Sequence, residues 1–142
     1  MGASARFTVA LHVLTLLAAR RREALTSEFI AGSVNTNPVV IRRVLGLLRE
    51  AGLAASQPGA HGGWKLRRDP ARITLLDVRR AVEEPPPFAM HARAPNPACP
   101  VGRNIQKALG RIYGEAEKAM ELQLARTTIE SLERRVRKRG VR

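Results

Sequence analysis

Two adjacent arginines, Arg42 and Arg43, have the clearest chemical potential in this sequence. They lie one turn into a segment, residues 38–51, whose apolar residues recur at helical spacing and leave both arginines on the other side. A guanidinium is a planar fork of donors that binds a phosphate, or the edge of a guanine, through two hydrogen bonds. The pair therefore predicts a helix face that contacts nucleic acid; the alternative is an ordinary solvated helix face.

Short polar residues precede this segment. Asn35, Thr36 and Asn37 form the predicted turn and cap, and Pro38 stands at the first helical position. Such groups at a helix N-terminus commonly bind phosphate, although they can equally serve only the local backbone. We take all three as candidate DNA contacts.

A second group of polar residues surrounds a glycine-rich turn. Residues 53–57 and 64–67 read as two strands, separated by Pro58 and three glycines. The candidate contacts here are Gln57, His61, Gly62 and Lys65. His61 has the alternative role of a solvated turn residue, and Trp64 is expected to pack within the hairpin.

Helices must position these groups, and their start signals are visible. Thr26 is a predicted N-cap, Thr74 with Asp77 reads as a capping box, and so does Thr127 with Glu130. The predicted helices cover about 3–20, 26–33, 38–51, 74–84, 101–125 and 128–138. The inward-facing residues of the second and third are expected to be Phe29, Ile30, Val40, Ile41, Val44, Leu45 and Leu48. Two helices, a turn and a hairpin wing match a shape that fits duplex DNA.

Composition agrees with that shape. The 142 residues carry a formal net charge of +13, and 21 of the 25 basic residues are Arg. One cysteine, Cys99, excludes an intrachain disulfide framework and a zinc site built from cysteines, and it suits a reducing cytoplasm. The apolar stretch 7–19 is too short to span a membrane. Few aromatic residues make a thin core, which favours completion by a partner subunit.

The long predicted helix carries a pairing seam. Apolar residues recur there at alternating steps of four and three, which is typical of helices that pair side by side. The candidate dimerisation residues are Ile105, Leu109, Ile112 and Ala116.

Cys99 heads this helix, with Arg103 one turn further on. A thiol in that position can be a redox sensor, whereas a lone cysteine can also be a small buried apolar residue. A thiol enzyme would need a base, and only His91 is near in the sequence. Alternatively, Phe88, Met90 and Tyr113 line a small-molecule pocket and the thiol is passive.

The assembled pattern resembles the Rrf-two family of bacterial winged-helix regulators. The resemblance rests on residues 25–31, on Ala51-Gly52-Leu53, on residues 59–66 with their Gly-Gly wing, on the Ile73-Thr74-Leu75-Leu76-Asp77 start of a helix, and on Cys99-Pro100-Val101-Gly102. It covers about residues 3–132. It implies a homodimer paired through the long helix, and DNA contacts from the start of the third helix and from the wing.

The chain departs from the family in two places. Cluster-binding members use three cysteines before the long helix, and Cys99 alone argues against an iron–sulfur cluster, so no cofactor is expected. Pro58 stands where some members carry a wing arginine.

The sequence thus predicts a mainly helical winged helix-turn-helix with a long dimerisation helix. We expect a DNA-binding domain at 1–84, a proline-rich loop at 85–100, and dimerisation helices with a basic tail at 101–142. The expected function is that of a cytoplasmic, homodimeric transcriptional regulator, a repressor of a duplex DNA operator with a thiol-redox or small-molecule signal. It is not expected to be an enzyme. The alternatives are a thiol enzyme using Cys99 and a sequence-neutral DNA-binding protein.

Overall fold

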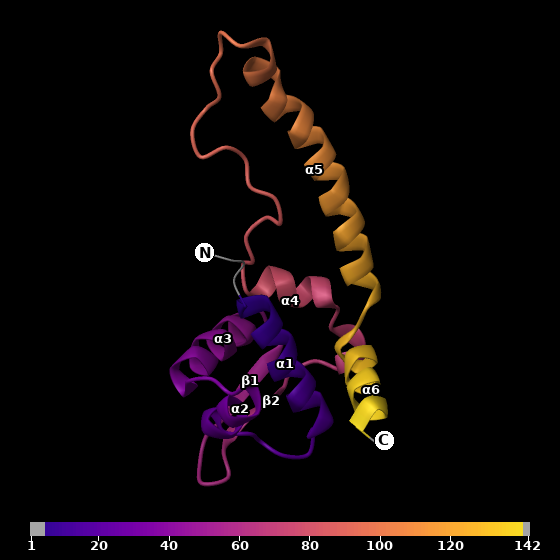
Figure 1. Cartoon of the computed structure of the whole chain (residues 1–142). Helices are drawn as coiled ribbons and strands as arrows, with labels where there is room; N and C mark the ends of the chain where they lie inside the picture. The colour runs from indigo at the N-terminus through magenta and orange to yellow at the C-terminus, as the bar shows by residue number, and fades with distance from the viewer. Residues whose placement is uncertain (1–4, 141–142) are drawn as a thin grey trace. The chain divides into compact units, whose positions relative to one another are not determined.

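The computed structural model describes residues 5–140 and is mainly helical with one antiparallel hairpin, which confirms the predicted fold class (Figure 1). The chain forms two compact units. One contains the residues up to 84 together with those from 124 onward, and the other contains residues 85–123. The predicted third segment, residues 101–142, is therefore divided between the two units, because the last helix groups with the N-terminal helices.

The helix-turn-helix is formed by α2 (Ser27–Val34) and α3 (Pro38–Glu50), and α1 (Arg6–Ala19) packs against both. The Thr26 hydroxyl accepts a hydrogen bond from the Phe29 amide at 3.1 Å, so the predicted N-cap of α2 is confirmed. Asn35 ends α2 in the left-handed conformation, with φ 61°. This residue lets the chain reverse direction within a few residues and start α3.

The wing is the hairpin of β1 (Ala54–Gln57) and β2 (Gly63–Leu66), in which Ser56 pairs with Trp64. Leu25 adds a bridge to Trp64, so the hairpin is joined to the segment that leads into α2. A Cβ on Gly63, whose φ is +150°, would lie 2.6 Å from the Leu25 carbonyl. Glycine is required at this close approach, which fixes the wing against the helix-turn-helix.

The rest of the first unit supports this arrangement. The short helix η1 (Pro70–Arg72) leads to α4 (Leu75–Ala81), where the capping box of Thr74 and Asp77 is confirmed by two 3.0 Å hydrogen bonds. The last helix, α6 (Ile129–Gly140), packs against α1 and η1.

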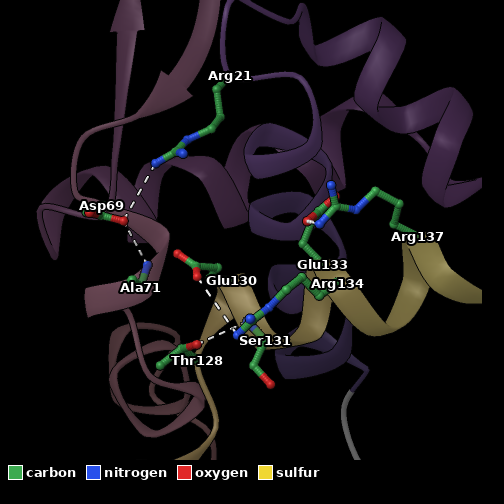
Figure 2. Close-up of polar contacts among 9 residues, drawn as sticks. All are labelled: Arg21, Asp69, Ala71, Thr128, Glu130, Ser131, Glu133, Arg134 and Arg137. Carbon is green, nitrogen blue, oxygen red and sulfur yellow. Dashed lines mark hydrogen bonds and ion pairs between the residues drawn. The ribbon is translucent and has the colours of Figure 1, made fainter.

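Thr128 caps α6, as its hydroxyl accepts a hydrogen bond from the Ser131 amide at 3.1 Å (Figure 2). The predicted capping box of Thr127 and Glu130 is wrong by one residue. The reason is that the backbone of Thr127 is engaged elsewhere: its carbonyl accepts a hydrogen bond from the Leu75 amide at 2.9 Å. Glu130 instead pairs with Arg134, and the largely buried Glu133 pairs with the exposed Arg137 (Figure 2).

The core of this unit lies between the helices. Its fully buried large side chains include Leu14 and Leu17 of α1, Ile30 of α2, Ile41, Leu45 and Leu48 of α3, and Ile129 of α6. Two predicted inward residues are not buried: Phe29 is 44% exposed and Val40 is 39% exposed. Phe29 lies under the Arg20 guanidinium, 4.7 Å from its ring centre, and Val40 lines a surface hollow beside α1.

The second unit consists of residues 85–99 and most of α5 (Pro100–Arg126). Within it, the ring of Phe88 stacks on Tyr113 with centroids 4.7 Å apart. The segment before the helix is thereby attached to the middle of the helix, although it has no regular secondary structure.

Candidate nucleic-acid interface

The start of α3 is organised by the turn residues that the sequence identified. The Asn37 side chain accepts a hydrogen bond from the Val39 amide at 2.8 Å, which confirms it as the N-cap. The Thr36 amide donates to the Ala31 carbonyl at 3.0 Å. The three turn residues, Asn35, Thr36 and Asn37, therefore stabilise the local backbone. Asn35 and Asn37 are also exposed at the positive end of the α3 dipole. An anion can approach there.

Arg42 extends from the exposed side of α3 toward α2. Its Nη2 donates a hydrogen bond to Oε1 of Glu28 at 2.9 Å, and both side chains are more than half exposed. The pKa of Glu28 is lowered, first by a hydrogen bond from its own backbone amide and then by Arg42, so the carboxylate is ionised at neutral pH. Sequence reasoning missed Glu28 as a partner because the two residues are 14 positions apart.

Arg43 faces a different direction. It lines a hollow with Val40 and Leu47 of α3 and with Arg6 and Val9 of α1. Successive helical residues are rotated by about 100°, so two neighbouring arginines cannot point to the same place. The structure therefore places Arg42 beside α2 and Arg43 beside α1, rather than bringing them together.

The wing residues form one polar groove with the segment between α1 and α2. Gln57, His61, Gly62 and Lys65 line this groove, together with Arg22 and Thr26. A Cβ on Gly62 would come within 2.2 Å of the Gln57 carbonyl oxygen, so only glycine fits the turn. Arg22 is a cationic residue that the sequence pattern did not assign to a site; its signal is the run Arg20-Arg21-Arg22 shortly before Thr26.

Trp64 has a structural role, as predicted. It packs against the core from β2, and the Arg49 guanidinium of α3 lies 5.7 Å from its ring centre. This contact links the end of α3 to the wing.

Cys99 is exposed and directly precedes α5, and its Sγ accepts a hydrogen bond from the Gly102 amide at 3.5 Å. The thiol is therefore not buried within the single chain. Among residues 5–140, no three His, Cys, Asp or Glu side chains come together as metal ligands. No helix in the same range is long and apolar enough to cross a membrane.

The seam residues lie on α5, which has no buried side chain within the single chain. Ile105 and Leu109 are half-buried, whereas Ile112 and Ala116 are exposed. Ile112 is 58% exposed, and other apolar residues of the helix, Val101 and Leu122, are exposed as well. Apolar side chains in contact with water along a 27-residue helix mark a surface that a partner can cover.

Comparison with known proteins gives a consistent result. A family model described as Rrf2, iron-dependent transcriptional regulator, matches residues 3–135. YwnA of Bacillus subtilis (strain 168), which carries the provisional name of an HTH-type transcriptional regulator, is 44% identical over 130 residues, spanning 91% of this chain and 95% of that protein.

Solved structures agree. One provisionally described as a DNA-binding protein is 40% identical and superposes with a TM-score of 0.71, covering 89% of this chain and 97% of the other. CymR, the global cysteine regulator of B. subtilis, is 25% identical with a TM-score of 0.71, covering 94% of this chain and 96% of its own.

Proposed function

We propose a function that starts from family membership: this chain belongs to the Rrf2 family of HTH transcriptional regulators, and is thus a DNA-binding regulator rather than an enzyme. The proposed function is that of a homodimer that recognises an operator and represses transcription. Cytoplasmic DNA is the expected partner, as the relatives are bacterial regulators. The observation that carries the proposal is that the wing is joined to both helices of the helix-turn-helix, through the Leu25–Trp64 bridge ahead of α2 and through the Arg49 guanidinium of α3 over the Trp64 ring.

The proposed contacts divide into two kinds. Arg42 and Arg43 flank the exposed face of α3, where a recognition helix meets base edges in the major groove. The sugar–phosphate backbone is assigned to Asn35, Thr36 and Asn37 at the start of α3, and to Gln57, His61, Gly62 and Lys65 in the wing. Base contacts would supply specificity, and backbone contacts would supply most of the affinity.

Dimerisation is proposed through the α5 seam of Ile105, Leu109, Ile112 and Ala116. The seam is apolar, with Ile112 and Ala116 exposed and Ile105 and Leu109 partly exposed in the single chain, so pairing with a second copy would remove it from water. A two-fold dimer presents two recognition helices, and its operator is then a near-palindrome. Repression is the simplest output because a dimer seated on a promoter physically excludes the polymerase.

Iron is not part of the proposal, despite the description of the family. Thiolate-bound clusters need several cysteines, and this chain has Cys99 alone. A signal at Cys99 is supported by the exposure of its thiol next to α5. The test compares operator affinity of wild type and Cys99→Ser, each reduced and peroxide-treated. A peroxide effect in wild type alone supports the thiol signal, and equal affinities in all four samples reject it.

The function itself is tested by selecting genomic DNA fragments on the purified full-length protein and sequencing those retained. The expected result is a small set of promoter fragments that share a two-fold motif, and repression of those promoters in transcription with purified polymerase. Retention of fragments without a common motif would instead indicate a sequence-neutral DNA-binding protein.

A further inference from the structure

We propose that Glu28 is a specificity-determining residue: from α2, its carboxylate holds the Arg42 guanidinium of α3 in the orientation in which it reads a base. The inference rests on the proposed function, since it assigns a cause to the discrimination that Arg42 provides. Glu28 is a positioning residue in this account and acts on DNA through Arg42.

The contact joins the two helices of the helix-turn-helix at their functional side. Glu28 lies in the first turn of α2, and its Oε1 accepts the hydrogen bond from Arg42 Nη2 at 2.9 Å. A guanidinium has five N–H donors, and a guanine edge requires two of them. One carboxylate can therefore orient Arg42 while donors remain for a base.

A contribution to the stability of the fold does not account for this ion pair. The Arg42 and Glu28 side chains are 53% and 66% exposed, and exposed pairs contribute little to stability. A free arginine side chain samples many rotamers, and binding a base would immobilise it at an entropic cost. A carboxylate that already restricts Arg42 reduces that cost for the sequence whose acceptors match the held orientation.

Glu28 has a second, opposite effect that the experiment must separate. Its negative charge near the proposed interface repels every phosphate backbone, so removing the charge strengthens binding to all duplexes. Positioning affects only the ratio of affinities for the operator and for a scrambled duplex of equal length. That ratio is the informative quantity.

The experiment measures this ratio for wild type, Glu28→Gln, Glu28→Asp and the control Glu23→Gln, using full-length protein and the operator from the genomic selection. Glu23 is an exposed carboxylate paired with Arg20 at 2.8 Å, so its substitution removes the same charge without touching Arg42. Glu28→Asp keeps the charge at the α2 N-terminus and shortens its reach by one methylene group.

We expect Glu28→Gln and Glu23→Gln to strengthen binding to scrambled DNA similarly. Glu28→Gln and Glu28→Asp should lower the ratio about fivefold or more, the lower end of what a bidentate base contact supplies. In the Arg42→Ala background, neither Glu28→Gln nor Glu28→Asp should change the ratio. Circular dichroism melting confirms that each variant is folded.

The experiment distinguishes failure of the role of Glu28 from failure of the proposed function. A wild-type protein with no operator preference would overturn the function on which the inference rests. A clear wild-type preference that both Glu28 variants retain, or that they alter equally in the Arg42→Ala background, would overturn the role of Glu28 alone.

Discussion

At the scale of single residues, neighbours in the sequence acquire different roles from their surroundings. Arg42 and Arg43 are adjacent, yet one is bound to Glu28 and the other lines a hollow beside α1. Arg22, which is far from both in the sequence, shares a groove with His61 and Lys65. Arg42 and Lys65 thus lie in different surroundings, Arg42 against Glu28 and Lys65 in the wing groove.

A base contact and a phosphate contact should respond differently to substitution. Arg42→Ala should cost about 1–3 kcal/mol of operator binding and relax sequence preference, because a base contact carries discrimination. Lys65→Ala should weaken binding to operator and scrambled DNA alike, since a phosphate contact is the same on every sequence. Fluorescence anisotropy with both duplexes measures this. An Arg42 variant with wild-type affinity and preference would remove that residue from the readout.

At the scale of elements, most local signals were predictable, the cap of α6 being an exception by one residue, and long-range ones were not. Asn37 with Pro38 and Thr74 with Asp77 were identified correctly because a cap and the backbone amide that donates to it lie within three residues. Phe29 was misplaced because α2 has only eight residues, too few for periodicity to define a buried face. The pairing of Glu28 with Arg42 depends on how α2 crosses α3, which no local pattern contains.

The placement of α6 is the largest such difference. The sequence grouped this helix with the dimerisation segment, whereas its first residue, Ile129, is completely buried in the core of the unit that contains α1 to α4. The Ile129 amide also donates to the Ile73 carbonyl at 2.9 Å. A stretch that begins with a buried isoleucine and continues with exposed arginines has an amphipathic pattern, but the pattern does not say which partner it covers.

Shortening a buried side chain tests whether α6 is part of the core. Ile129→Ala should destabilise the unit that contains α1 to α4 by about 2–5 kcal/mol, because it leaves a cavity in a closely packed core. Val136→Ala, at a 56% exposed position of the same helix, should change the stability little. Urea denaturation followed by circular dichroism reports both values. If the two variants were equally stable, α6 would not be an integral part of the core.

At the scale of the whole molecule, the account requires two copies. Ile112→Asp introduces a charge into the proposed α5 seam, and because Ile112 is exposed in the single chain, the monomer should stay folded while the dimer dissociates. Lys118→Asp, an exposed α5 position outside the seam, should leave the dimer intact. Analytical ultracentrifugation at micromolar concentration measures the mass. Wild-type protein that sediments as a monomer yet binds a single site tightly would rule out the seam.

The central claim is that this basic chain recognises one DNA sequence rather than DNA in general. The most direct measurement is the affinity for the selected operator and for a scrambled duplex of equal length, each as a function of salt concentration. Both affinities should fall with salt, by about 0.9 log units per log unit of salt for each neutralised phosphate. At physiological salt the operator should be preferred by about a thousandfold or more. A preference of about tenfold or less, well below the range of specific regulators, would contradict the account.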